Sequence, residues 1–411
     1  MKPVLHIEIV QRSQSRANKD GIKELVRPFL MNLVSLCPGA ILSESDLGEY
    51  HDLKEHVQMI TVCDIDNDTE VIASEAVLVY HIYKLDTFGA ETDTMTDSST
   101  GEEFAAAEVW ALPSQEFHGL WESLIYDTKL KEDTVRFVET AFEFADRGVD
   151  PNIIGWNRVV LLHGPPGTGK TSLCRALAQK LSIRLAERFP RVRLVEINAH
   201  GLFSKWFAES GKLVARLFER LEEIVADPRL LACVLVDEVE SLAHARRAAL
   251  SGLEPSDSIR AVNALLTQLD RLRRRPNALV LTTSNVTGAI DVAFVDRADI
   301  KRRVGPPSAR AAYEILRGCC VQLMARGLVT PREALPAPRA DGAAPAGGPG
   351  AALWAVAAAA AARAVSGRAL RRLPFLARAL HVRGDASLPR FVAALDAALR
   401  DHLADSAALQ D

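Results

Sequence analysis

Residues 159–171 have the sequence Val-Val-Leu-Leu-His-Gly-Pro-Pro-Gly-Thr-Gly-Lys-Thr, and the rest of the chain is organised around them. Residues 159–162 are an unbroken apolar run, the pattern of a β-strand buried on both faces. Residues 164–171 form a complete G-x-x-x-x-G-K-[ST] phosphate loop. Residues 172–178 follow it without a helix breaker. A strand, a loop and a helix in this order predict a binding site for a nucleoside triphosphate.

The residue types of this loop suit phosphate chemistry. Glycine lets the backbone approach so closely that successive N–H groups face phosphate oxygens, and the helix N-terminus adds its positive end. We expect Lys170 to reach the β- and γ-phosphates and the Thr171 hydroxyl to be a ligand of Mg²⁺. The predicted cofactors are therefore ATP and Mg²⁺, with the nucleotide bound by Gly164, Pro165, Pro166, Gly167, Thr168, Gly169, Lys170 and Thr171.

Two later apolar runs end in polar residues that complete a hydrolytic site. Residues 231–236 form a strand pattern that ends in the carboxylates Asp237 and Glu238. Asp237 would hold Mg²⁺ through water, and Glu238 would polarise the attacking water. Residues 278–285 form another strand pattern whose last residue, Asn285, could position water beside the γ-phosphate.

Composition bounds the class of protein. The chain has 411 residues, 48% hydrophobic and 25% charged, and a net charge of −4, which argues against an overall polybasic nucleic-acid binder. No apolar run approaches the length of a membrane span, so we expect no membrane contact. The spacing of the six cysteines suits neither zinc nor a disulfide framework, so reduced thiols and an intracellular location are expected.

Three domains are predicted from the pattern along the chain. Residues 1–100 alternate short strand patterns with polar turns and favour a small α+β recognition domain, with an acidic linker or exposed loop at 86–103. Residues 101–305 form the second predicted domain, in which strands and helices alternate from residue 157 onward, as is typical of a parallel α/β sheet flanked by helices. Residues 306–411 predict a small helical lid, interrupted at 333–362 by an Ala/Gly/Pro-rich insert that favours a linker or a loosely specified helix.

Several strings together resemble AAA+ ATPases: the phosphate loop, Val236-Asp237-Glu238, Thr283-Ser284-Asn285 and Ser366-Gly367-Arg368. Longer strings resemble the pachytene checkpoint protein 2 family, also called the thyroid receptor-interacting protein 13 family. They are residues 117–121, 202–212, 254–257 and 294–301.

The resemblance implies a homohexameric ring that uses ATP to remodel HORMA-domain proteins, often presented by an adaptor. Such a ring disassembles spindle-checkpoint and meiotic chromosome-axis complexes. The resemblance thereby implies roles in the cell cycle, meiosis and meiotic recombination. It also implies a nuclear or cytosolic, chromosome-associated location.

The resemblance assigns further roles by position. Asn285 matches the first sensor and Arg368 the second sensor in the lid. Lys205, Trp206 and Phe207 match the central pore loop, where an aromatic grips an extended substrate chain. Arg297 is the best match to the arginine finger that acts on a neighbouring subunit, ahead of Arg302 and Arg303.

A nucleic-acid-acting AAA+ machine, such as a clamp loader or helicase, is the alternative function. Its basis is a basic cluster that could touch a phosphate backbone, although a solvated helix end is the commoner meaning of such a cluster. The cluster consists of Arg271, Arg273, Arg274 and Arg275.

Overall fold

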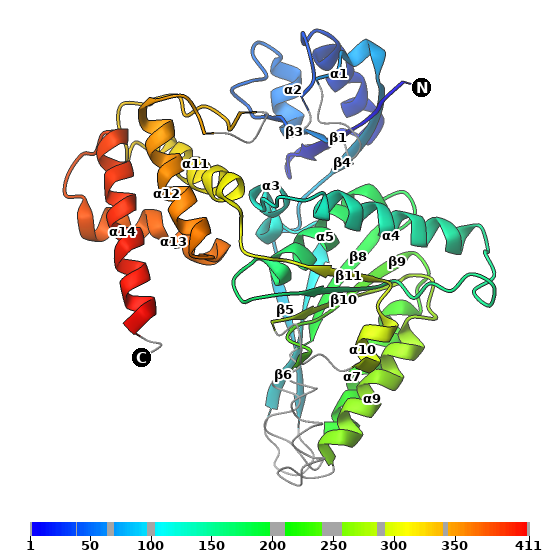
Figure 1. Cartoon of the computed structure of the whole chain (residues 1–411). Helices are drawn as coiled ribbons and strands as arrows, with labels where there is room; N and C mark the ends of the chain where they lie inside the picture. Colours follow the sequence, from blue (N-terminus) through cyan, green and yellow to red (C-terminus); the bar gives the residue numbers. More distant parts are fainter. Residues whose placement is uncertain are drawn as a thin grey trace.

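The structure is a computed structural model that describes residues 2–37, 39–63, 70–96, 103–197, 210–240, 257–285, 292–339 and 344–408. Figure 1 shows three bodies along the chain: a small N-terminal domain, a central sheet between helices, and a helical C-terminal lid. The predicted fold class, a parallel α/β sheet with an α+β N-terminal domain and a helical lid, is confirmed. No described helix is both long and apolar enough to cross a membrane.

The N-terminal domain is a sheet of strand order β2-β3-β1-β4 with helices packed against it. Strand β1 pairs antiparallel with β3 and parallel with β4. Alternate residues of β1, Leu5, Ile7 and Ile9, are fully buried in the domain's core, as their period-2 pattern predicts. The elements are β1 (Val4–Gln11), α1 (Lys19–Met31), β2 (Ile41–Leu42), α2 (His51–His56), β3 (Val57–Cys63), η1 (Ala73–Glu75) and β4 (Val77–Tyr83).

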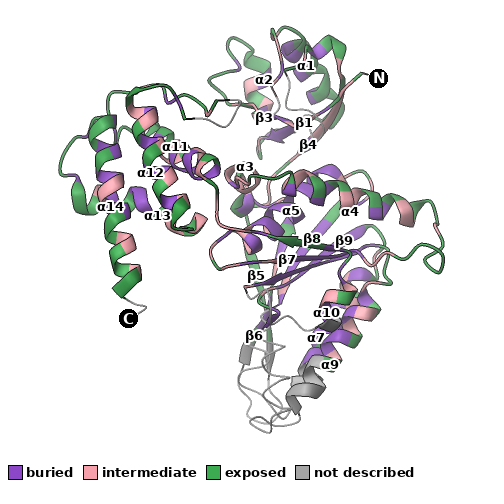
Figure 2. Cartoon of the chain, in the orientation of Figure 1, coloured by how far each residue is buried: buried purple, intermediate pink, exposed green. Residues whose placement is uncertain are grey.

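The central sheet has the strand order β11-β7-β10-β9-β8-β6-β5. The strands from β11 to β8 are parallel to one another, so their carboxyl ends lie at one edge of the sheet. Strands β7, β9 and β10, in the middle of the sheet (Figure 2), are almost entirely buried, which explains their apolar runs. The bounds are β5 (Ala90–Thr96), β6 (Glu103–Leu112), β7 (Val159–His163), β8 (Arg191–Ile197), β9 (Leu230–Val236), β10 (Ala278–Ser284) and β11 (Ile300–Arg303).

The prediction of a linker or exposed loop at 86–103 is wrong for residues 90–96. These residues form β5, which pairs antiparallel with β6, while β6 pairs antiparallel with β8. The acidic composition predicts an exposed segment without regular structure, but backbone pairing with β6 supplies hydrogen bonds that composition does not reveal. The two sheets therefore divide between β4 and β5, ahead of the predicted domain boundary at residue 100.

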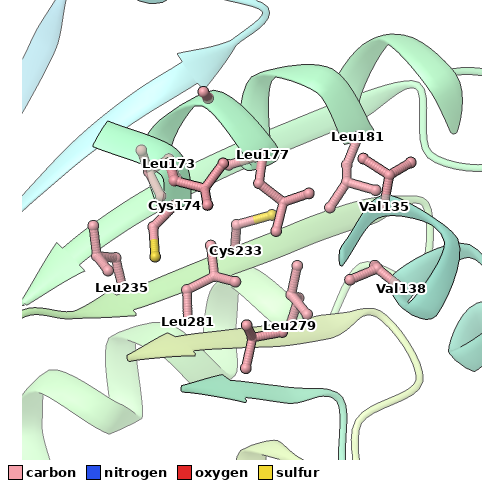
Figure 3. Packing of buried hydrophobic residues seen from close by; sticks show 14 of the residues in the cluster. Val135, Val138, Leu173, Cys174, Leu177, Leu181, Cys233, Leu235, Leu279 and Leu281 are labelled. Atoms are coloured by element: carbon pink, nitrogen blue, oxygen red, sulfur yellow. The ribbon is translucent and has the colours of Figure 1, made fainter. Parts of the chain in front are cut away.

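Helices cover both faces of the central sheet (Figure 1). On one face, Leu173 and Leu177 of α5 and Val135 of α4 pack on Cys233 and Leu279 of the sheet (Figure 3). On the other face, α7, α9 and α10 contribute to a second apolar cluster. The bounds are η2 (Gln115–Phe117), α3 (Leu120–Ser123), α4 (Leu130–Asp146), α5 (Lys170–Arg184), α7 (Ser210–Val225), α9 (Asp257–Leu272) and α10 (Val292–Arg297).

The lid consists of α11 (Ala309–Ala325), α12 (Gly348–Ala362), α13 (Gly367–Leu376), η3 (Ala377–His381) and α14 (Leu388–Ala408). The Ala-rich part of the predicted insert is α12, and its residues Leu353, Val356 and Ala360 are buried in the lid core. Alanine's high helix propensity and a few larger apolar residues at helical spacing are enough to fix this helix. This part of the insert is therefore a packed helix and not a linker.

A buried ionic cluster joins the N-terminal domain to α5, the helix that follows the phosphate loop. Glu8 of β1 accepts hydrogen bonds from Lys180 Nζ at 2.7 Å and from Arg184 Nε at 3.1 Å, and all three side chains are at most 4% exposed. Burial by itself raises the pKa of Glu8, but the two cations outweigh this effect and lower it. Buried ion pairs therefore hold the N-terminal sheet against α5.

Candidate active site

The phosphate loop has a backbone shape that side chains would obstruct. Gly164, Gly167 and Gly169 have φ angles of +139°, +75° and +94°. A Cβ on Gly164 would lie 2.3 Å from the Val304 carbonyl oxygen, and one on Gly167 would lie 2.8 Å from Ser366 Oγ. Helix α5 begins directly after the last of these glycines, so its free N–H groups point into the loop. Such a cradle fits the phosphates of a nucleotide.

Lys170 lies folded against the loop that carries it. Its Nζ donates to the carbonyl oxygens of Gly164 at 2.9 Å and Pro165 at 2.8 Å. Burial lowers the pKa of Lys170, and the nearby Arg368 guanidinium adds to this, against the opposing effect of Glu240 and Asp237. The ammonium is therefore held within reach of the cradle by bonds that phosphate oxygens could replace.

A hydroxyl and a carboxylate meet at the start of α5. Thr171 Oγ1 donates to Asp237 Oδ1 at 2.9 Å and lies 3.1 Å from Oδ2. A threonine hydroxyl beside a carboxylate is an oxygen donor set that Mg²⁺ accepts. The structure brings together the two residues that the sequence predicts as metal ligands, and their chemistry fits that ion.

Thr283, on β10, holds the carboxylate pair in place. Its hydroxyl hydrogen-bonds to Asp237 Oδ1 and accepts from the backbone N–H of Glu238 at 3.2 Å. Sequence reasoning assigned no role to Thr283. The signal was a polar side chain within an apolar strand, where Thr283 is 1% exposed and needs a partner.

Glu238 and Asn285 lie side by side where β9 and β10 end. Glu238 has a φ of +55°, a conformation that costs a non-glycine residue energy and that often occurs at functional sites. Asn285 Nδ2 donates to Glu238 Oε1 at 3.1 Å, and Asn285 N donates to Glu240 Oε1 at 3.0 Å. The predicted base and the predicted first sensor are therefore in direct contact.

A cavity of about 300 Å³ opens between the phosphate loop and the lid. Arg368 lines it, and its backbone N–H donates to the Gly167 carbonyl at 3.0 Å. Tyr126 also lines the cavity, and its Oη donates to the Gly169 carbonyl at 3.2 Å. Residues of the stretches 124–128 and 303–307 also line the cavity. The sequence does not predict this role, because neither stretch carries a motif.

Comparison with known proteins agrees with this geometry. Residues 160–306 match the family described as "ATPase family associated with various cellular activities (AAA)". Residues 1–88 match the TRIP13 N-terminal domain, and residues 308–403 match the TRIP13-like AAA+ ATPase lid C-terminal domain.

Relatives named "Pachytene checkpoint protein 2 homolog" cover most of the chain. The mouse protein is 44% identical over 407 residues, which is 97% of this chain and 93% of the relative. The Arabidopsis thaliana protein is 49% identical over 336 residues, which is 80% of this chain and 70% of the relative. The solved structure of C. elegans PCH-2 superposes with a TM-score of 0.79 at 34% identity, covering 98% of this chain and all of that one.

This chain belongs to the pachytene checkpoint protein 2 family. It is accordingly an ATP-hydrolysing AAA+ enzyme, as the sequence predicts. The structure of an E. coli HORMA:CdnC:Trip13 complex shares the fold, with a TM-score of 0.55 at 18% identity over 70% of this chain and 94% of that one.

Arg297, the residue predicted as the arginine finger, does not line the cavity. Arg297 is on α10, and its guanidinium makes two hydrogen bonds of 2.8 Å to the Asp270 carboxylate of α9. Arg302 approaches Asp133 at 3.9 Å, while Arg303 lines the cavity. Within the described protomer, Arg297 is therefore not brought to its own phosphate loop.

Two members of the basic cluster are engaged within the chain. Arg275 pairs with Glu222, and Arg273 donates to Asn157 Oδ1 at 3.0 Å. These contacts tie the end of α9 to its neighbours. The predicted pore-loop residues Lys205, Trp206 and Phe207 lie outside the described residues.

Proposed function

We propose that this protein is a homohexameric ring ATPase that partly unfolds HORMA-domain proteins, and thereby disassembles spindle-checkpoint and meiotic chromosome-axis complexes. The observation that carries the proposal is that the N-terminal domain and the lid match the TRIP13 family models on either side of an AAA ATPase core. The E. coli complex of the same fold, HORMA:CdnC:Trip13, pairs a HORMA protein with Trip13 and supports the same substrate class. The site of action would be chromosomes in the nucleus, or the cytosol, with an adaptor presenting the substrate.

Each residue around the phosphate loop has its own role in ATP hydrolysis. Mg²⁺, when bound, neutralises phosphate charge, and Thr171 and Asp237 would hold it. Lys170 exchanges its bonds to loop carbonyls for bonds to phosphate oxygens. Glu238 orients and polarises the attacking water, and Asn285 holds the Glu238 carboxylate in the required direction. Arg368 joins the lid to the loop and lets the lid respond to the nucleotide.

Arg297 would complete the site of the next subunit. Arg297 does not line the cavity of its own protomer, which supports action across an interface, and such arginines contribute about 10³ to 10⁵ in rate. An isolated protomer should therefore hydrolyse ATP slowly. In the ring, Trp206 between Lys205 and Phe207 would grip the substrate chain through contacts that do not depend on its sequence.

Mass measurement of the Glu238→Gln variant with and without ATP tests the assembly. We expect a hexamer with ATP that turns over little nucleotide and captures purified HORMA-domain proteins. Brisk hydrolysis by this variant would contradict the role of Glu238, and a monomer under all conditions would contradict the ring.

Trp206→Ala tests the coupling to substrate, with the exposed Phe88→Ala as a matched aromatic control. We expect Trp206→Ala to keep ATPase activity and lose unfolding of a HORMA protein, while the control keeps both. Retained unfolding would remove the pore-loop assignment. Salt-sensitive DNA affinity with DNA-stimulated hydrolysis would favour the nucleic-acid alternative instead.

A further inference from the structure

Glu240 is a buried carboxylate that the predicted chemistry does not use. It follows Glu238 by two residues and is only 9% exposed, which is rare for glutamate. Its Oε1 accepts the backbone N–H of Asn285 at 3.0 Å. Its Oε2 is buried and has no hydrogen-bond partner among the described residues. Such a group is costly to bury, so its presence beside the site needs an explanation.

The position of Asn285 supplies this explanation. This residue comes directly after β10, where the backbone pairing with the neighbouring strands ends. Glu240 supplies the acceptor that its N–H would otherwise lack, and the Asn285 side chain reaches Glu238 Oε1 from that fixed backbone. Glu240 thus contacts the Asn285 backbone, and the side-chain amide of Asn285 contacts Glu238.

We propose that Glu240 is a positioning residue for ATP hydrolysis: its carboxylate fixes the backbone of Asn285 and thereby keeps the Asn285 amide on Glu238. This inference rests on the proposed roles of Glu238 and Asn285. It predicts that Glu240 affects turnover through Asn285 and not through nucleotide affinity.

A double-mutant cycle on the full chain tests it. Glu240→Ala and Asn285→Ala should each lower kcat about tenfold or more, since small misplacements of reacting groups cost up to about 10²-fold. The double variant should lose no more than about twofold beyond Asn285→Ala, because both changes remove one coupled interaction. Nucleotide affinity, measured with a fluorescent ATP analogue, should stay within about twofold in all three.

Two further variants separate positioning from folding. Glu240→Gln keeps an oxygen that can accept from Asn285 N, and it should return kcat to within about fivefold of the unsubstituted protein. Glu116→Ala is the matched control, because Glu116 accepts one N–H, from Trp110 Nε1 at 2.8 Å, and does not line the cavity. Its kcat should be unchanged.

The outcomes are distinct. Multiplied losses in the double variant, about 10²-fold or more, or an equal loss in Glu240→Gln and Glu240→Ala, would overturn the positioning role. If Asn285→Ala leaves kcat unchanged while Glu238→Gln abolishes it, the sensor role and this inference are both wrong, although hydrolysis through Glu238 stands. If the double-mutant cycle gives the expected kcat values but the protein does not unfold HORMA-domain proteins, only the proposed substrate is overturned.

Discussion

The hydroxyl of Thr171 donates to the carboxylate of Asp237 at 2.9 Å, across 66 residues of sequence. The contact joins the first turn of α5 to the residue that follows β9, so it depends on the packing of this helix on the sheet. Both side chains bind through oxygen, and a divalent ion could be held between them without rearranging either element. Catalytic competence is therefore tied to the packing of the sheet.

Asp237→Asn should raise the Mg²⁺ concentration that supports half-maximal hydrolysis by about tenfold or more. The amide keeps the size of the carboxylate but removes the negative charge that attracts the ion. Titration of ATPase activity with Mg²⁺ at constant free ATP measures the change. Asp227→Asn, on the loop between α7 and β9, is the control and should leave the titration curve unchanged. An unaltered Mg²⁺ dependence in Asp237→Asn would remove this residue from the metal site.

Thr283→Val should lower kcat about tenfold and leave the oligomer intact. Valine preserves the shape of the side chain but removes the hydroxyl that contacts Asp237 and the Glu238 N–H. The loss of one such buried hydrogen-bonding group costs about 1–3 kcal/mol.

Steady-state ATPase kinetics give the measurement, and Thr282→Val provides the control on the same strand. The Thr282 hydroxyl is also buried but donates to the Val160 carbonyl, at 3.0 Å. The control should lose stability without a comparable loss of kcat. Equal kinetic losses in both variants would mean that Thr283 acts only on folding.

The parts of the site that sequence predicted are local motifs, and the parts it missed depend on contacts between distant residues. Lys170 and Thr171 are fixed by the spacing of the loop, and Asp237 by its place after an apolar strand. Glu240 looks like any polar residue after that strand until Asn285 is brought to it. Composition also gives a wrong prediction for residues 90–96, because the pairing of β5 depends on the backbone of β6 and not on hydrophobicity.

Glu8→Ala should destabilise the N-terminal domain's attachment to α5 by about 3–5 kcal/mol. The reason is that the change leaves the buried Lys180 and Arg184 without their shared counter-charge. Urea unfolding and limited proteolysis near residues 84–89 would report the release of the domain.

The control is Glu44→Ala, which breaks the pair of the exposed Glu44 with the half-buried Arg12 in the same domain. Exposed pairs contribute about 0–1 kcal/mol, so its unfolding curve should hardly move. If Glu8→Ala behaves like this control, the buried cluster does not hold the two domains together.

The environment of His6 and His81 predicts that acid lowers the stability of the N-terminal domain. Their rings stack with centroids 5.2 Å apart, and His6 Nδ1 lies 2.9 Å from His81 Nε2. Burial, together with the nearby Arg184, lowers the pKa of His6 to about 3 and that of His81 to about 4. In the unfolded chain both would titrate near their ordinary value of about 6.5.

The two states bind equal numbers of protons at these histidines above pH 7, so the pair adds no pH dependence there. Below about pH 6.5 the unfolded chain gains protons that the folded chain excludes, and the free energy of unfolding falls until about pH 3, where His6 as well as His81 is protonated in the folded chain. His81→Phe should therefore flatten the decline in melting temperature between pH 7 and pH 5. His51→Phe, an exposed position on α2, should keep the decline of the unsubstituted protein. An equally steep decline in His81→Phe would show that other groups, such as carboxylates, cause the loss of stability in acid.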